Sequence, residues 1–135
     1  MHEEPVILFV CEHGAAKSVI AAVHFNRLAE EAGLQIKALA RGTKPDLEIS
    51  EQTIRGLSMD GLALTEPAPQ KLSPDDIQTA QYLVSFCELP AEYTQGAVVA
   101  EQWDGIPAVS ENYERARDAI VERLHQLVSR IRRSS

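Results

Sequence analysis

The sequence predicts an α/β sandwich built around a parallel sheet, and three observations support this fold class. Residues 6–11 form an apolar run, mostly β-branched or aromatic, which is typical of a strand buried on both faces of a parallel sheet. An amphipathic helical pattern follows it, and strand and helix signals then alternate along the chain. The 135 residues are 44% hydrophobic and 24% charged, which fits one globular domain with a substantial core.

The first half of the chain contains two strand and two helix signals. The first strand ends in the thiol of Cys11, and apolar residues at helical spacing predict a helix over residues 19–34, with Gly33 suited to its C-terminal stop. Residues 35–40 are typical of a second strand, and residues 41–45 of the turn after it. A second helix is expected over residues 50–59, closed by Asp60-Gly61.

The second half continues the alternation. An N-cap serine, a proline and two acidic residues at positions 73–76 predict the start of a short helix. Residues 82–86 are typical of a third strand with Cys87 at its C-terminal end, and residues 97–100 of a short fourth strand. The last helix is expected over residues 112–132. Its buried face would carry Ala116, Ile120, Leu124, Leu127 and Ile131.

The segment after the first strand has the features of an anion site. Five short or flexible loop residues separate Cys11 from Lys17, and Ser18 stands at the head of the first helix. Backbone N–H groups of such a loop and the helix N-terminus point at one spot, which favours the thiolate of Cys11 and makes it a nucleophile. Ser18 either caps the helix or also donates to the Cys11 sulfur. The predicted oxyanion-binding residues are Glu12, His13, Gly14, Ala15, Ala16 and Lys17.

Charge and composition narrow the partners. Thirteen basic against twenty acidic residues give a net charge of −7, which argues against nucleic-acid and membrane-surface binding. The acidic start, residues 1–5, is unlike a signal peptide, and no apolar run reaches membrane-spanning length, so we expect a cytoplasmic protein. Two cysteines cannot build a disulfide framework, and without clustered histidines or carboxylates we expect no metal site.

Several candidate residues also have a purely structural interpretation. Cysteine is among the most buried residue types, so a cysteine at a strand end is often inert. The adjoining loop favours a functional thiol at Cys11. Cys87 has no such loop, so a packed, inert cysteine and a functional thiol are equally good interpretations there. We expect His13 to be exposed and secondary, because amides bind the anion, and His24 and His125 to be surface residues of helices.

With these residues in place, the chain resembles the low-molecular-weight protein tyrosine phosphatase superfamily, whose thiol-dependent arsenate reductases share its fold. The resemblance rests on a strand ending in cysteine, five loop residues, a cation and a serine, and it extends over nearly the whole chain. Further matches are residues 40–43, 82–87, 103–104 and 114–120. It implies a three-layer sandwich over residues 1–135, with a four-stranded parallel sheet of order 2-1-3-4 and helices on both faces.

The chain also departs from the family pattern. Lys17 replaces the usual arginine, which keeps the charge but loses the two parallel hydrogen bonds of a guanidinium. Gly14 replaces the asparagine that braces the loop. The Asp-Pro pair that supplies the family's general acid is missing from residues 103–110, where Asp104 is the only nearby carboxylate and so the candidate acid.

Three functions are compatible with these features. The first is a thiol-based arsenate reductase, and the second is a phosphatase that forms a cysteinyl-phosphate. The third is a catalytically weakened oxyanion-binding or redox-sensing protein. We favour the reductase, with the phosphatase second, because residues 103–110 lack an Asp-Pro acid and residues 108–112 offer no aromatic ring before Tyr113 to flank a phosphotyrosine.

The resemblance also suggests how a reductase would complete its cycle. Cys87 stands where the resolving cysteine of such reductases begins, and in the implied fold its strand neighbours that of Cys11, so the two thiols are expected to pair. Thr94 stands where thioredoxin-coupled relatives place a further cysteine, so no three-cysteine relay is possible. An external thiol such as thioredoxin, glutaredoxin or a small thiol must then act, and no bound cofactor is expected.

Overall fold

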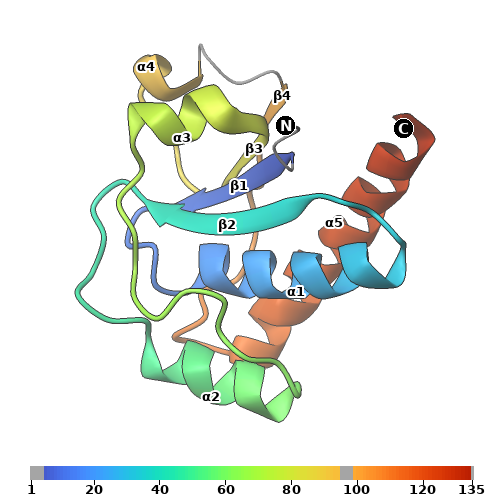
Figure 1. Cartoon of the computed structure of the whole chain (residues 1–135). Coiled ribbons are helices and arrows are strands. Elements are labelled where there is room, and N and C mark those ends of the chain that lie inside the picture. The colour runs from blue at the N-terminus through green and yellow to red at the C-terminus, as the bar shows by residue number, and fades with distance from the viewer. Residues whose placement is uncertain (1–4, 95–98, 135) are drawn as a thin grey trace.

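The computed structural model describes residues 5–94 and 99–134 and contains one parallel sheet (Figure 1). Its strands lie in the order β2-β1-β3-β4, and every neighbouring pair is parallel, as the sequence and the resemblance led us to expect. The central strand β1 is apolar along its length, as expected of a strand covered on both faces. The strand bounds are β1 Val6–Cys11, β2 Lys37–Gly42, β3 Ala80–Ser85 and β4 Val99–Gln102.

Helices cover both faces of this sheet and complete the three expected layers. In Figure 1, α1 and α2 lie below the sheet and α3 and α4 above it, while α5 packs against α1 and rises at the right. Alternate residues of β1 serve the two layers, since Ile7 and Phe9 belong to the larger apolar cluster and Leu8 and Val10 to the smaller one. The helix bounds are α1 Lys17–Glu31, α2 Glu51–Met59, α3 Pro74–Thr79, α4 Ala91–Thr94 and α5 Tyr113–Ser134.

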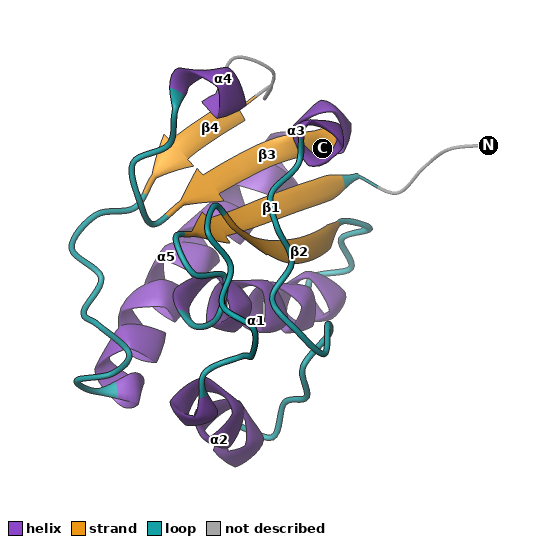
Figure 2. Cartoon of the chain, turned by 90° about the vertical axis from the view of Figure 1, so that its left-hand side faces the viewer, coloured by secondary structure: helices purple, strands orange, loops and turns teal. Residues whose placement is uncertain are grey.

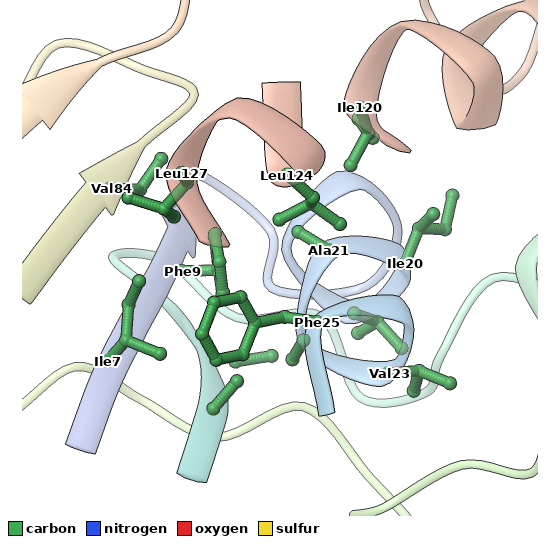
Figure 3. Packing of buried hydrophobic residues seen from close by; sticks show 14 of the residues in the cluster. Ile7, Phe9, Ile20, Ala21, Val23, Phe25, Val84, Ile120, Leu124 and Leu127 are labelled. Carbon is green, nitrogen blue, oxygen red and sulfur yellow. The ribbon is translucent and has the colours of Figure 1, made fainter. Parts of the chain in front are cut away.

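The larger cluster lies between the sheet and the two longest helices (Figure 3). Its aromatic centre joins strand, helix and late loop, because the Phe9 ring lies 5.8 Å from that of Phe25 and 6.0 Å from that of Trp103. All five apolar residues expected on the buried face of the last helix are buried, and Val128 joins them. This packing fixes the end of β1 relative to the start of α1.

Pairing along the sheet shifts several boundaries from those the sequence predicts. β2 runs to Gly42, two residues beyond the expected end, because Gly42 pairs in register with Cys11. β3 begins at Ala80 rather than at residue 82, because Ala80 pairs with Val6 of β1. β4 extends to Gln102, while residues 97 and 98 of the expected fourth strand lie outside the described residues.

The helix boundaries shift as well. The first helix, expected over residues 19–34, begins at Lys17 and ends at Glu31. Gly33, two residues after its end, adopts the left-handed conformation (φ +71°) expected of a stop residue. The last helix is confirmed with small extensions at its C-terminal end. α4 was not predicted, because a single turn after Pro90 is too short to show a hydrophobic period. None of the helices within the described ranges is long and apolar enough to cross a membrane.

The prediction that His24 is a surface residue is wrong. Only 3% of this residue is exposed, because α2 and α5 pack over this part of α1. The His24 Nε2 atom lies 3.1 Å from Asp60 Oδ2, and Asp60 also accepts hydrogen bonds from Tyr113 and Arg117 at the start of α5. Burial lowers the pKa of His24 against the opposing effect of Asp60. His125 is exposed, as expected.

Candidate active site at the carboxyl end of β1

The candidate site lies where the parallel strands end, at the edge of the sheet from which β1 leads into α1 (Figure 2). Cys11 closes β1, residues 12–16 form the following loop, and Lys17 begins the helix. The carboxyl ends of parallel strands are the usual place for a ligand in an α/β sheet, because helix N-termini and loops meet there. Here that position brings the thiol, the loop and a helix N-terminus together.

The loop is held in place through its carbonyl groups. The backbone oxygens of residues 11, 12, 13 and 15 accept hydrogen bonds from the segment that follows β2. Within the described ranges, the backbone N–H groups of residues 12–17 donate no loop hydrogen bond to another backbone carbonyl, so these donors are available to an anion. The N–H donors that hold the carbonyls belong to Thr43, Lys44, Asp46 and Ser50, at distances of 3.3, 2.8, 3.0 and 3.0 Å.

Gly14 gives the loop its tight curvature. Its φ of +62° lies in the left-handed region, which glycine and asparagine adopt most readily. The substitution for the family's asparagine therefore keeps a residue suited to this conformation. A Cβ on Gly42, at the end of β2, would lie 2.7 Å from the Gly14 nitrogen, so the backbones meet without room for a side chain.

Ser18 serves the sulfur rather than the helix end. The N-cap of α1 is Ala16, and no side chain caps the helix. Ser18 is fully buried, and its Oγ lies 3.0 Å from Cys11 Sγ. A thiolate has no hydrogen to offer, so in that form of Cys11 the Ser18 hydroxyl is the donor.

A pocket of about 350 Å³ opens over this loop. It is bounded by the loop, by the segment from Asp46 to α2, by the residues after β3 and by the loop before α5. Cys11, Lys17 and Cys87 all line it, so the structure brings both cysteines and the cation of the sequence motif to one cavity. The other lining residues are Glu12, His13, Ala15, Ala16, Asp46, Ser50, Gln52, Phe86, Ala108, Val109 and Ser110.

Cys87 is a free, partly buried thiol just beyond β3. Its backbone N–H donates to Ser85 Oγ at 3.1 Å, and the same hydroxyl lies 3.7 Å from Cys87 Sγ. Burial raises the pKa of the Cys87 thiol, and the nearby charges of Cys11 and Glu12 raise it further, against the Ser85 hydrogen bond and Lys17. Cys87 therefore stays protonated more readily than an ordinary cysteine.

Asp104 is not brought to this pocket. It is exposed, its carboxylate accepts a hydrogen bond of 3.0 Å from Gln102, and it is absent from the residues that line the cavity beside Cys11. Trp103 is buried in the large cluster and donates through Nε1 to Glu101 at 2.8 Å. The chain therefore turns away from the cavity after β4 and approaches it again only at residues 108–110.

Sequence reasoning missed four polar residues of the pocket, Asp46, Ser50, Gln52 and Ser110. Asp46 Oδ1 lies 3.2 Å from Nδ1 of His13, which is exposed as expected. Gln52 donates to the Ser110 carbonyl at 3.3 Å and so joins two walls of the pocket. A signal for Asp46 was present, because residues that follow neighbouring parallel strands meet at one edge of the sheet. No group of three potential metal ligands occurs in the part of the chain that the structure describes.

The profile of the family described as low molecular weight phosphotyrosine protein phosphatase matches residues 6–97, which include the loop and both cysteines. The chain belongs to this family of enzymes. No curated protein sequence matches the chain significantly.

Solved structures of arsenate reductases and phosphatases share the fold. The arsenate reductase from Archaeoglobus fulgidus has 28% sequence identity and a TM-score of 0.71, over 91% of this chain and 98% of that one. The thioredoxin-dependent arsenate reductase Cg_ArsC1' from Corynebacterium glutamicum has 24% identity and a TM-score of 0.75, over 98% of this chain and 64% of that one. The low molecular weight protein tyrosine phosphatase from T. tengcongensis has 16% identity and a TM-score of 0.84, over 93% and 99%.

Proposed function

We propose that this protein is a thiol-based, arsenate reductase-like enzyme in which Cys11 attacks an oxyanion held by residues 12–17. The observation that carries the proposal is the presence of a second thiol, Cys87, in the pocket of Cys11. A phosphatase needs one nucleophilic cysteine, whereas a reductase needs two electrons, which two thiols provide as they form a disulfide. The 28% identity to an arsenate reductase from A. fulgidus agrees with this choice.

The loop supplies the charge complement for a tetrahedral oxyanion. The unpartnered N–H groups of residues 12–17 and the N-terminus of α1 provide oriented dipoles, and Lys17 provides a full positive charge in the same cavity. Ser18 donates to the Cys11 thiolate and holds it at the base of the pocket. These local groups bind an anion although the chain as a whole carries a net charge of −7.

The reaction proceeds in two displacements. The Cys11 thiolate attacks the arsenic of arsenate, the S–As bond forms, and one oxygen leaves as water after taking up protons. The partly buried Cys87 thiol releases its proton to solvent, and the thiolate attacks Cys11 Sγ. The S–S bond forms and the S–As bond breaks with its electron pair on arsenic, which leaves as arsenite. The raised pKa of Cys87 favours its protonated thiol before arsenate binds.

An external thiol closes the cycle. Both cysteines of the chain are consumed in the disulfide, and Thr94 offers no third sulfur. Thioredoxin, glutaredoxin or a small thiol would attack the disulfide and restore both thiols. Such a cycle suits the cytoplasm, where thiols are kept reduced, and requires no bound cofactor.

A phosphatase is the second candidate, and the family match favours it. The same cradle would hold the phosphate of an ester while Cys11 forms a cysteinyl-phosphate that water hydrolyses. This reaction gains from an acid that protonates the leaving oxygen. Asp104 does not line the pocket, so the late loop does not deliver its carboxylate there.

Parallel assays of the purified protein separate these functions. We expect arsenite from arsenate in the presence of thioredoxin, glutaredoxin or glutathione, and little hydrolysis of an aryl phosphate. Stoichiometric arsenate without reductant should give a Cys11–Cys87 disulfide, detected by mass spectrometry as the loss of two hydrogens. Cys87→Ser should abolish that loss, with Cys11→Ser as the control that also blocks the first step. Ester hydrolysis alone would establish the phosphatase, and binding without turnover an oxyanion-binding or redox-sensing protein.

A further inference from the structure

His13 and Asp46 form an ion pair at the mouth of the Cys11 pocket. Nδ1 of His13 lies 3.2 Å from Asp46 Oδ1, and both residues line the cavity. Their side chains are 61% and 55% exposed, so the pair exchanges protons with solvent. The main chain supports the contact, because the Asp46 N–H donates to the His13 carbonyl at 3.0 Å. A main-chain hydrogen bond and a side-chain ion pair therefore hold these residues together.

The pairing determines which imidazole nitrogen can exchange a proton. The Asp46 carboxylate lies beside Nδ1, which favours a hydrogen on that nitrogen and leaves Nε2 outside this contact. Nε2 lies 4.0 Å from Glu12 Oε2, so a second carboxylate lies on the other side of the ring. The other ionisable side chains that line the cavity are Cys11, Lys17 and Cys87.

Either proposed reaction needs a proton at this place. When Cys11 bonds to arsenic or phosphorus, an oxygen leaves, and proton transfer to such a group typically accelerates the step by about 10² to 10⁴. Asp104 does not line the pocket, and among its described lining residues His13 is the only imidazole. Imidazole is the side chain best matched to proton transfer near neutral pH.

We propose that His13, oriented by Asp46, is the proton donor to the oxygen that leaves when Cys11 attacks. This assignment rests on the proposed function. As the Cys11 S–As or S–P bond forms and the bond to the leaving oxygen breaks, the proton moves from His13 Nε2 to that oxygen. The group departs as water or an alcohol, and neutral His13 regains a proton from solvent. Asp46 is a positioning residue, since it keeps the other nitrogen protonated.

Kinetics with substrates that differ in their leaving group test the proton transfer. The probes are arsenate, followed in a single turnover, and phenyl phosphate and 2,4-dinitrophenyl phosphate. For His13→Gln we expect a loss of about 10²-fold with arsenate and phenyl phosphate, and a much smaller loss with dinitrophenyl phosphate, whose anion leaves without a proton. Asp46→Asn should weaken the same reactions and change their pH profile. His125→Gln and Glu48→Gln, exposed residues outside the pocket, are the matched controls.

Two further measurements keep the assignment falsifiable. Alkylation of Cys11 by iodoacetamide needs no proton donor, so its rate in His13→Gln reports on the nucleophile alone and should stay near that of the wild type. NMR of the imidazole nitrogens should show hydrogen on Nδ1 of His13 in the neutral form, and Asp46→Asn should weaken that preference. Turnover that His13→Gln leaves intact, an equal loss with all leaving groups, or hydrogen on Nε2 alone would overturn the assignment while the proposed function stands. A wild-type protein that transforms none of the probes would refute both.

Discussion

Replacement of Gly42 by alanine should damage the anion site from a neighbouring strand. An alanine Cβ would lie 2.7 Å from the nitrogen and 2.9 Å from the Cα of Gly14, closer than packed atoms approach. Both are backbone atoms, so the loop that follows Cys11 must shift as a unit. Gly42 does not have a positive φ, so the substitution tests this contact rather than backbone strain.

The size of the effect follows from the overlap. Overpacking of this kind costs about 1–3 kcal/mol. An unfolding entropy of about 2.1 cal/mol/K per residue gives about 0.28 kcal/mol/K for 135 residues, so Tm should fall by about 4–11 °C. A displacement of about 1 Å in a positioned group can cost about 10²-fold, so phosphate or arsenate should bind about that much more weakly.

Protection of Cys11 from iodoacetamide by phosphate measures the affinity of the cradle, and thermal denaturation measures the fold. Gly56→Ala is the matched control, because its added Cβ would overlap the Tyr113 ring, and neither residue lines the Cys11 pocket. We expect Gly56→Ala to lower Tm and to keep the protection of Cys11 by phosphate. Gly42→Ala should lower Tm and also weaken that protection. Full protection in Gly42→Ala would refute the idea that the Gly14–Gly42 contact shapes the anion site.

Three further results are expected. Lys17→Arg should tighten phosphate binding, measured by titration, because a guanidinium donates two parallel hydrogen bonds; weaker binding would mean that the loop is shaped around lysine. Ser18→Ala should slow alkylation of Cys11 at neutral pH about tenfold, since a hydrogen bond to a charged group is worth about 1.5 kcal/mol or more, and an unchanged rate would exclude that role. The pKa of His24 is lowered from 6.5 in the fold, so the unfolded state binds its proton first as the pH falls. The free energy of unfolding should therefore hold above pH 6.5 and decline below it toward the lowered value; urea denaturation of His24→Gln should lack that decline, and an equal decline in both proteins would contradict the assignment.

The sequence by itself determined the elements and the centre of the site. The apolar run ending at Cys11 predicted a strand buried on both faces, and the spacing of Ala116 to Ile131 predicted the buried face of a long helix. Lys17 and Ser18 follow Cys11 at fixed short separations, so local chain geometry brings them together. These inferences depend on neighbours in sequence, where period and residue type carry the information.

Only the tertiary structure decided what lies beside that centre. His24 has the local sequence of a helix surface, but α2 and α5 bury it and give it Asp60 as a partner. Asp46 reaches His13 because β2 pairs with β1 and ends at the same edge of the sheet. Asp104, the candidate acid of the loop before the last helix, lies outside the pocket. Such contacts join residues far apart in the chain, and strand register and helix packing set them, so no local pattern records them.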